Sequence, residues 1–310
     1  MLTLLLACTP QTAPLAPTGQ ATLPDASVMA PPVASPGSGP TAPAPAAPQD
    51  VFPAPARVVA VGDLHGDVAS AIGALELAKV VDATGHWTGG GTWLVQTGDV
   101  LDRGKDGPTM IRFLTQLEQE AAAAGGRALI LDGNHEVMNL QGDWRYVADL
   151  AEFGAAPDPQ AARRTWMAEG AGGAWVRGHG MVVQVGETVF VHAGIDSHWA
   201  SYGVSGLNTL FRAALAAPPD PKSGVTGPDG PVWNRAYLLE DPPAICPELK
   251  RALAELHATR MVVGHTTQET GRIAERCEGT FYGIDTGISA YYGVHPSALV
   301  IEGSAVTLLP

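Results

Sequence analysis

Short hydrophobic runs in the first half of the chain each end in glycine and a polar residue. The runs and the residues that follow them are 57–61 with Gly62-Asp63, 92–97 with Gly98-Asp99, and 128–132 with Gly133-Asn134. Apolar runs of about four to eight residues that stop at a turn signal are typical of buried β-strands. The pattern therefore predicts three strands, each followed by a loop that carries a polar side chain.

Segments with apolar residues at helical spacing separate these runs. They cover residues 68–80 and 108–124, and Gly125-Gly126 is a stop signal for the second segment. Strands that alternate with helices predict an α/β layered fold, in which polar residues that follow the strands gather at one edge of the sheet. We expect the functional site at that edge.

The second half of the chain supplies further strands. Residues 181–185 and 188–192 predict a hairpin, and the run 260–264 leads into His265. Closing strands are expected at 281–284, 297–301 and 305–309. Segment 141–179, rich in Trp, Arg and Gly, is interpreted as a helical insertion near the mouth of the site.

The N-terminal 56 residues have a different composition. Residues 9–56 are mostly Pro, Ala, Thr, Ser and Gly and hold 13 of the 26 prolines, so we expect a disordered linker ahead of a folded domain at 57–310. Residues 5–8, Leu-Leu-Ala-Cys, resemble a bacterial lipobox, so residues 1–8 are interpreted as a remnant of a lipoprotein signal with Cys8 as a membrane tether in the cell envelope. Because no cationic start precedes this stretch, a cytoplasmic protein is the alternative.

Composition limits the classes of function. With 18 basic and 31 acidic residues, the formal charge of -13 repels nucleic acid, and no basic run overrides it. No stretch approaches the roughly 18 apolar residues of a transmembrane helix. The three cysteines form no CxxC pair, which disfavours a zinc knuckle, while Cys246 and Cys277 remain available for a disulfide in an oxidising compartment.

The polar residues after the strands are of types that bind metal ions. Asp63 and His65 lie two positions apart, so both side chains can point to one side of an extended loop and chelate one ion. The carboxylate of Asp99 has two oxygens and can bridge two cations. The set is completed by Asn134, His192 and His265. Each residue alone is more often a turn or structural group, whereas the ordered set predicts a two-metal site.

Three motifs in this set resemble those of a known family. The stretches that begin at Gly62, Gly98 and Gly133 read GDLHG, GDVLDRG and GNHE, and resemble the metallophosphoesterase superfamily of calcineurin-like proteins, in its phosphoprotein phosphatase branch. Segments 133–147 and 262–268 are most similar to the bacterial Shewanella-like phosphatases, and the resemblance extends from Arg57 to about Glu302.

The resemblance implies a fold and a metal content. The fold would be a four-layer α/β sandwich of two mixed β-sheets flanked by helices. Two divalent metal ions are implied, and a ligand set of this kind accepts Mn, Fe or Zn. The implied ligands are Asp63, His65 and Asp99 for one ion, and Asp99, Asn134, His192 and His265 for the other.

The resemblance also implies how phosphate esters would be cleaved. His135 would act as the general acid that protonates the leaving alcohol, and Asp102 would orient and charge it. A hydroxide that bridges the two ions would attack phosphorus, so no covalent enzyme intermediate is required.

Two arginines and an amide are the expected phosphate contacts. Arg103 is the best candidate for a bidentate grip on phosphate, and an ion pair with Asp102 or Glu136 is the alternative. Arg235 occupies the family's second arginine position, although the usual Trp-Ser-Arg reads Trp-Asn-Arg here. Asn134 is also assigned to the phosphate. Further arginines in the insertion either guide an anionic substrate or are solvated and ion-paired: Arg145, Arg163, Arg164 and Arg177.

The sequence thus predicts a phosphatase for phosphate monoesters, with phosphoproteins as the favoured substrates at serine, threonine or tyrosine. A tethered envelope protein would also meet small phosphate esters. Two alternatives stay open. One is a nucleotide or dinucleotide polyphosphate hydrolase of the same superfamily, and the other is a non-catalytic metal-binding module at the cell surface. Residues 283–293 replace the C-terminal segment of eukaryotic Ser/Thr phosphatases, so specificity cannot be transferred from those enzymes.

Overall fold

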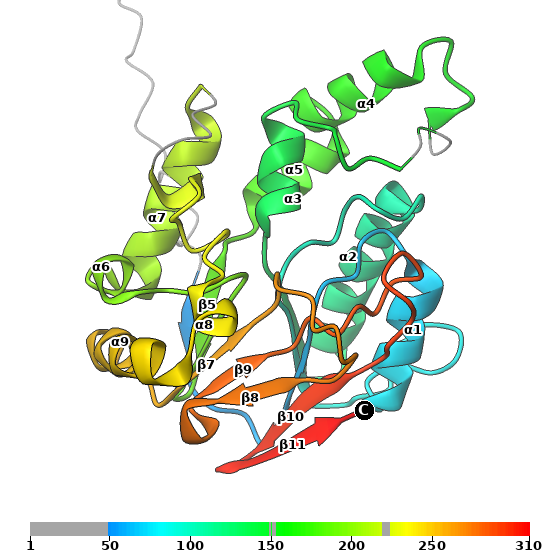
Figure 1. Ribbon diagram of the computed structural model, residues 1–310. Coiled ribbons are helices and arrows are strands. Elements are labelled where there is room, and N and C mark those ends of the chain that lie inside the picture. The colour runs from blue at the N-terminus through cyan, green and yellow to red at the C-terminus, as the bar shows by residue number, and fades with distance from the viewer. Residues whose placement is uncertain (1–48, 149, 151–152, 219–223) are drawn as a thin grey trace, which may run out of the picture. The chain divides into compact units, whose positions relative to one another are not determined.

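The computed structural model describes residues 49–148, 150, 153–218 and 224–310 (Figure 1). Cys8, the expected signal remnant and the linker as far as residue 48 lie outside the described residues. Within the described part, no helix is both long and apolar enough to cross a membrane.

One sheet carries the first three expected strands. Its strand order is β11-β10-β2-β3-β4, in which β2, β3 and β4 are parallel and β10 runs antiparallel to both β2 and β11. The strands are β2 (Val58–Val61), β3 (Trp93–Gln96), β4 (Arg127–Ile130), β10 (Ala298–Glu302) and β11 (Ala305–Leu309). Helices α1 (Val68–Leu77) and α2 (Gly107–Ala123) make the parallel crossovers between them.

The second sheet is built mainly from the second half of the chain. Its order is β1-β5-β6-β7-β9-β8, and it contains both parallel and antiparallel pairs. The strands are β1 (Val51–Phe52), β5 (Val182–Val185), β6 (Thr188–Val191), β7 (Arg260–Val263), β8 (Ala274–Arg276) and β9 (Phe281–Gly283). The expected hairpin at 181–192 is therefore the β5–β6 pair.

Alternation of side chains along the strands produces the layers. In β2, Val59 and Val61 join the core beneath α1 and α2, whereas Val58 and Ala60 face the core between the sheets. In β6, Phe190 enters that same central core, while Val189 and Val191 pack under helices on the outer face of the second sheet. The strands are apolar on both faces because both faces are covered. The predicted fold of two mixed sheets flanked by helices is confirmed.

The helices of the second face were not anticipated from the sequence. They are α6 (Ser197–Ala200), α7 (Gly203–Ala216), α8 (Ala236–Leu239) and α9 (Pro242–Glu255), with a short 3-10 turn η2 (Gly224–Thr226) after α7. Buried side chains such as Leu207, Phe211 and Leu249 attach α7 and α9 to the sheet. In Figure 1 these helices flank the side of the molecule opposite α1 and α2.

The expected insertion at 141–179 contains two helices and follows a third. Helix α3 (Asn134–Leu140) begins inside the GNHE motif, and α4 (Pro159–Ala168) and α5 (Ala171–Gly178) form a pair that Figure 1 shows beyond the strand ends. Asp158 caps α4 by accepting a hydrogen bond from the backbone N–H of Ala161 at 3.0 Å, and Pro159 begins the first turn.

The folded unit extends ahead of Arg57, where the sequence placed the start of the domain. Val51 and Phe52 form β1, which pairs in parallel with β5, and the Asp50 carboxylate accepts hydrogen bonds from Asn208 at 2.8 Å and Arg212 at 3.3 Å. The folded domain therefore begins by Asp50. A strand of two residues depends on the neighbouring strand for its stability. It is also too short to give a recognisable strand pattern within a Pro- and Ala-rich segment.

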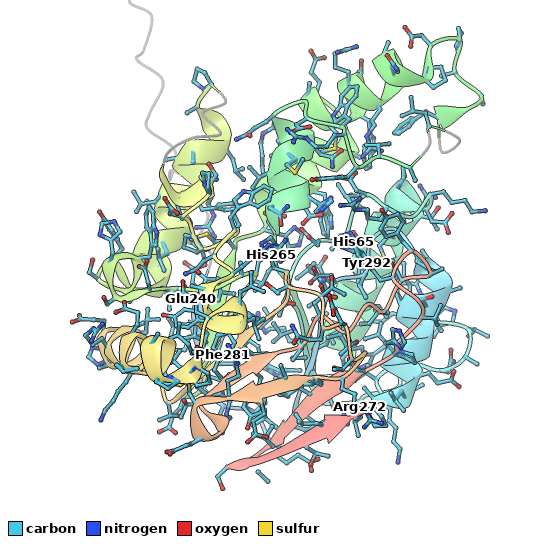
Figure 2. All side chains as sticks on the ribbon, in the orientation of Figure 1. His65, Glu240, His265, Arg272, Phe281 and Tyr292 are labelled. Carbon is cyan, nitrogen blue, oxygen red and sulfur yellow. A yellow bond between two sulfur atoms is a disulfide. The ribbon has the colours of Figure 1, made fainter. Side chains whose placement is uncertain are left out.

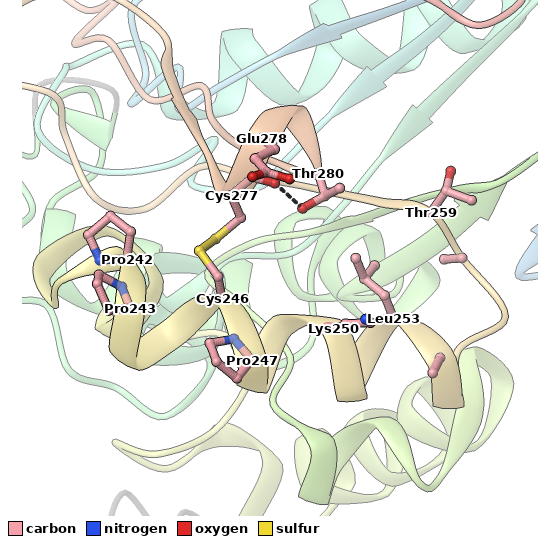
Figure 3. A pocket seen from close by; sticks show the side chains of 12 residues that line it. Pro242, Pro243, Cys246, Pro247, Lys250, Leu253, Thr259, Cys277, Glu278 and Thr280 are labelled. Carbon is pink, nitrogen blue, oxygen red and sulfur yellow. Dashed lines mark hydrogen bonds between the residues drawn. A yellow bond between two sulfur atoms is a disulfide. The ribbon is translucent and has the colours of Figure 1, made fainter.

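A disulfide joins Cys246 of α9 to Cys277, the pair considered from the sequence. Cys277 begins the 3-10 turn η3 (Cys277–Gly279) between β8 and β9. Figure 3 shows the bond beside a surface groove that Pro242, Pro243 and Pro247 also line. The bond ties an outer helix to the edge of the second sheet.

Candidate active site

Strand ends deliver all six expected metal ligands to one place. Asp63 and His65 follow β2, Asp99 follows β3, and Asn134 follows β4 as the first residue of α3. His192 and His265 follow β6 and β7 of the other sheet. All six side chains are buried. The site therefore lies where the carboxyl ends of strands from both sheets meet, as the sequence predicted.

Several of these residues occupy the left-handed region of backbone conformation. The φ angles of His65, Asp99 and His265 are 46°, 54° and 65°, and those of Asp102 and Arg103 are 68° and 64°. Residues other than glycine rarely adopt this backbone conformation. Where they do, the surrounding structure enforces it, most often at functional sites. The loops are held in sharp turns that direct these side chains into the cluster.

Backbone carbonyls fix the orientation of the three candidate histidine ligands. Nδ1 of His192 lies 2.8 Å from the carbonyl oxygen of Thr97, and Nδ1 of His65 lies 3.1 Å from that of Leu101. Nε2 of His265 lies 3.2 Å from the carbonyl oxygen of Trp233. Since a carbonyl only accepts, each ring donates there and directs the unprotonated nitrogen into the cluster.

The groups that meet inside the cluster are acceptors. Nε2 of His192 lies 3.1 Å from Nδ1 of His265, 3.0 Å from Oδ1 of Asn134 and 3.3 Å from Oδ1 of Asp99. Nε2 of His65 lies 3.9 Å from a carboxylate oxygen of Asp63 and equally far from one of Asp99. Lone pairs that converge in this way repel one another unless cations lie between them.

The charge balance of the cluster also calls for cations. Burial, together with the carboxylates of Asp285 and Asp99, raises the pKa of Asp63 well above its usual range. Burial lowers the pKa of His65 to about 4, and burial, His192 and Arg235 lower that of His265 strongly. Neutral imidazoles and crowded carboxylates are the forms that bind divalent metal ions, so these residues fit the two-metal site.

The geometry is compatible with a shared role for Asp99. Its Oδ1 lies by His192 and its Oδ2 by His65, so the two carboxylate oxygens face the two halves of the cluster. Two groups of ligand-type side chains share this residue: His65, Asp99 and His135, and Asp99, His192 and His265. The presence of His135 in the first group was not expected.

His135 differs from the other histidines in its partner. Its Nδ1 lies 2.8 Å from Oδ2 of Asp102, so this ring donates to a carboxylate, while its Nε2 lies 3.8 Å from Oδ2 of Asp99. Burial alone would lower the pKa of His135, but the charges of Asp99 and Asp102 outweigh burial and raise it. A histidine that retains a proton suits a general acid better than a ligand.

Glu136 and Asn139, which the sequence analysis did not assign to the site, hold this arrangement in place. The Glu136 carboxylate accepts hydrogen bonds from the backbone N–H of Asp99 at 2.9 Å, of Gly133 at 2.7 Å, and of Val100 and Leu101 at 3.0 Å. Asn139 donates to both oxygens of Asp102, at 2.9 and 3.0 Å. Glu136 is part of the GNHE motif, which was the available signal.

Arg103 follows Asp102 in the chain and lies between two tyrosines. Its guanidinium carbon lies 3.8 Å from the ring centre of Tyr146 and 4.9 Å from that of Tyr291, and Nη1 lies 3.2 Å from the Tyr291 hydroxyl. The alternative of an ion pair with Asp102 or Glu136 is not seen, since no carboxylate among the described residues pairs with this guanidinium. Stacking holds it in position with donors left for an anion.

The guanidinium of Arg235 is already hydrogen-bonded within the protein. Its Nη1 donates to the carbonyl oxygen of His265 at 2.9 Å and lies 3.3 Å from the Thr266 hydroxyl. Of the insertion's arginines, Arg145 pairs with Asp143 at 2.7 Å and Arg164 stacks on Trp144, both at the surface. Arg163 is buried against Asp102.

The segment after β9 closes another side of the site. Figure 2 shows Tyr292 beside His65, with ring centres 5.3 Å apart. The Asp67 carboxylate, from the first motif, accepts a hydrogen bond from the backbone N–H of Ala290 at 2.7 Å and thereby fastens this segment. The positions of Tyr291 beside Arg103 and of Tyr292 beside His65 were not predicted, because their segment departs from the family pattern.

A buried cluster of histidine and carboxylate ligands at the joint edge of two mixed sheets defines a metal-dependent phosphoester hydrolase. The model of the calcineurin-like phosphoesterase family matches residues 56–268, more than half of the chain. The chain belongs to the calcineurin-like phosphoesterase family.

Individual relatives agree with this assignment. The chain is 32% identical over 292 residues to Shewanella-like protein phosphatase 2 of Arabidopsis thaliana, and the matched region covers 78% of this chain and 73% of the relative. It is 36% identical over 255 residues to an uncharacterized protein of Schizosaccharomyces pombe, covering 77% and 75%. Among solved structures it is similar to the cold-active protein-tyrosine phosphatase of a psychrophile Shewanella sp., with a TM-score of 0.74, 28% identity and coverage of 84% and 82%.

Proposed function

We propose that this protein is a phosphoprotein phosphatase that hydrolyses phosphate monoesters of tyrosine, serine or threonine side chains, with His135 as the general acid. The observation that carries the proposal is the contrast between two kinds of histidine. His192 and His265 direct unprotonated nitrogens at each other 3.1 Å apart, whereas His135 donates to Asp102. A site of this kind can bind cations and still hold a proton for the leaving group.

Each side chain has a defined part in this proposal. Two divalent cations, when bound, would activate water for attack and neutralise charge on the phosphoryl oxygens. The ligands would be Asp63, His65, Asp99, Asn134, His192 and His265. The proton of His135 would pass from Nε2 to the departing oxygen, while Asp102 keeps the ring oriented through Nδ1.

Phosphate binding would depend chiefly on Arg103. Its guanidinium is held by Tyr146 and Tyr291 but by no carboxylate among the described residues, so it can bind two phosphoryl oxygens at once. Arg235 would contribute less, because one of its nitrogens already binds the His265 carbonyl. Asn134 is the third proposed contact.

Direct hydrolysis by water is supported by the state of the cysteines. Cys246 and Cys277 are bonded to each other and lie in a groove with Pro242 and Lys250 rather than with the ligand cluster. Over the described residues, no free thiol is therefore offered as a nucleophile. The similarity to a protein-tyrosine phosphatase of Shewanella supports phosphotyrosine as one of the proposed substrates.

Substrate choice is the decisive experiment. Purified protein would be made metal-free, loaded separately with Mn²⁺, Fe²⁺ or Zn²⁺, and assayed on phosphotyrosine and phosphoserine peptides and on diadenosine tetraphosphate. We expect release of phosphate from peptides, a loss of about 10²- to 10⁴-fold in His135→Ala, and unchanged metal content in that variant. Faster hydrolysis of the dinucleotide would favour a polyphosphate hydrolase, and no hydrolysis at all would favour a metal-binding surface module.

We propose in addition that the chain is tethered to a membrane through Cys8. The support is the lipobox-like sequence at residues 5–8 and the Pro- and Ala-rich stretch that follows it. Cys8→Ala should move the protein from the membrane fraction to the soluble fraction. Equal membrane retention of both forms would contradict the tether.

A further inference from the structure

The insertion places a buried cation against Asp102, the aspartate that binds the proposed acid His135. Arg163 of α4 has a side chain only 2% exposed, and its Nη2 lies 3.1 Å from Oδ1 of Asp102, whose side chain is fully buried. The same nitrogen donates to Oδ1 of Asn139. These contacts join residues that are 61 and 24 positions apart in the sequence.

The two oxygens of Asp102 have different partners as a result. Oδ2 faces Nδ1 of His135 at 2.8 Å, while Oδ1 faces Arg163 at 3.1 Å. Asn139 donates to both oxygens and also to the backbone carbonyl oxygen of His135 at 2.9 Å. Loss of the guanidinium would leave Oδ1 bonded to the Asn139 amide and would remove the charged contact that helps to fix the rotation of the carboxylate.

We infer that Arg163 is a positioning residue for leaving-group protonation, which acts through Asp102 on His135 and makes the α4–α5 insertion a part of the catalytic apparatus. The inference rests on the proposed function. Charge-assisted hydrogen bonds to a buried carboxylate are strong and directional, and a planar guanidinium imposes more geometry than an ammonium group.

The step that Arg163 would support balances as follows. The water oxygen forms a bond to phosphorus and loses one proton to solvent, while the bond between phosphorus and the leaving oxygen breaks. The leaving oxygen takes the proton on Nε2 of His135, and solvent later restores it. A misoriented ring would impair only the transfer to the leaving oxygen, so the defect should grow as the leaving group becomes more basic.

The alternative is that Arg163 only fastens the insertion to the domain. The metal-loaded enzyme would be assayed as wild type, Arg163→Met and Arg163→Lys, on p-nitrophenyl phosphate, whose leaving group needs little protonation, and on phenyl phosphate, whose leaving group needs more. In Arg163→Met we expect kcat/KM to fall about 10- to 100-fold for phenyl phosphate and less than about threefold for p-nitrophenyl phosphate. Arg163→Lys should show the same selectivity with a smaller loss.

A second comparison tests whether Arg163 acts through His135. Adding Arg163→Met to His135→Asn should produce no further loss on phenyl phosphate, because residues that work as one unit are not additive. Arg164→Met is the matched control, since Arg164 is the exposed neighbour on the same helix and stacks on Trp144. It should behave as wild type.

Several outcomes would overturn the inference. Equal losses on both substrates, or additive losses in the double variant, would reduce Arg163 to a structural clamp. Melting temperature and bound-metal content would be measured for every variant, and if Arg163→Met does not fold, Arg163→Lys alone must reproduce the selective loss. If wild type hydrolyses neither ester with any metal, the proposed function itself fails, which is a separate result.

Discussion

Nε2 of His192 lies 3.1 Å from Nδ1 of His265, and the other nitrogen of each ring donates to a backbone carbonyl. The two facing nitrogens therefore carry lone pairs, so the folded chain holds them against their mutual repulsion. A cation held by both residues would relieve this repulsion. If the pair binds metal as proposed, metal binding and the stability of the fold are coupled through it.

Metal removal should therefore destabilise the protein. A cation present at 100 times its dissociation constant adds about 2.7 kcal/mol to the free energy of unfolding. For a domain of this size that corresponds to a fall in melting temperature of roughly 5–10 °C when a chelator is added. His192→Ala should show a much smaller fall. Equal shifts in both proteins, measured by calorimetry, would contradict the proposed ligand role.

Removal of the Arg103 guanidinium should weaken transition-state binding. Arg103→Ala is expected to reduce kcat/KM for p-nitrophenyl phosphate by about 10²- to 10³-fold, the usual cost of losing one donor to a developing anion. Arg103→Lys should recover little, because an ammonium group cannot bind two oxygens or stack on Tyr146 in the same way. Arg145→Ala is the control, since Arg145 is exposed and paired with Asp143. A similar loss in both alanine variants would point to long-range charge instead.

Loss of the disulfide should lower stability without affecting the ligand cluster. The bond between Cys246 and Cys277 closes a loop of sequence separation 31. Because a closed loop lowers the entropy of the unfolded chain, the bond should add about 3.5 kcal/mol to the free energy of unfolding. The double variant Cys246→Ser, Cys277→Ser should unfold at lower urea concentration than wild type and should not respond to reducing agent. Metal content should stay the same. A reducing agent that leaves the wild-type midpoint unchanged would contradict the prediction.

The ligand loops could be predicted from the sequence because each is local. Asp63 and His65 lie two positions apart after a recognisable strand, and the strand order then collects the loops at one edge. The contacts of Arg163 with Asp102 and of Arg103 with Tyr291 could not be predicted. These contacts join residues 61 and 188 positions apart in the sequence. Their geometry depends on how the insertion and the loop 283–293, which departs from the family pattern, pack against the two sheets.

Glu136 and Asn139 form an intermediate case. Both lie within or beside the GNHE motif, so their nearness to the site followed from the sequence. Their functions did not, because a buried Glu can bind metal, donate a proton or accept backbone hydrogen bonds. The structure shows that Glu136 accepts from four backbone N–H groups and fixes the Asp99 loop.

Asp132 provides a test of how burial affects stability. Its side chain is fully buried and neither oxygen has a hydrogen-bond partner among the described residues. Burial and the nearby Glu136 carboxylate raise the pKa of Asp132 well above its usual range. Between the ordinary aspartate pKa, about 3.9, and that raised value, the folded state binds more protons than the unfolded state, so this residue makes stability fall as pH rises.

Asp132→Asn removes this titration while keeping the shape of the side chain. The variant should match wild type near pH 4 and exceed it by about 1–3 kcal/mol in free energy of unfolding at pH 8, measured by urea denaturation of metal-loaded protein. Asp158→Asn is the control, because the Asp158 carboxylate accepts a hydrogen bond at the start of α4 and should give no gain at high pH. A gain of equal size at both pH values would show that the effect comes from packing, since an ionisation penalty must grow with pH.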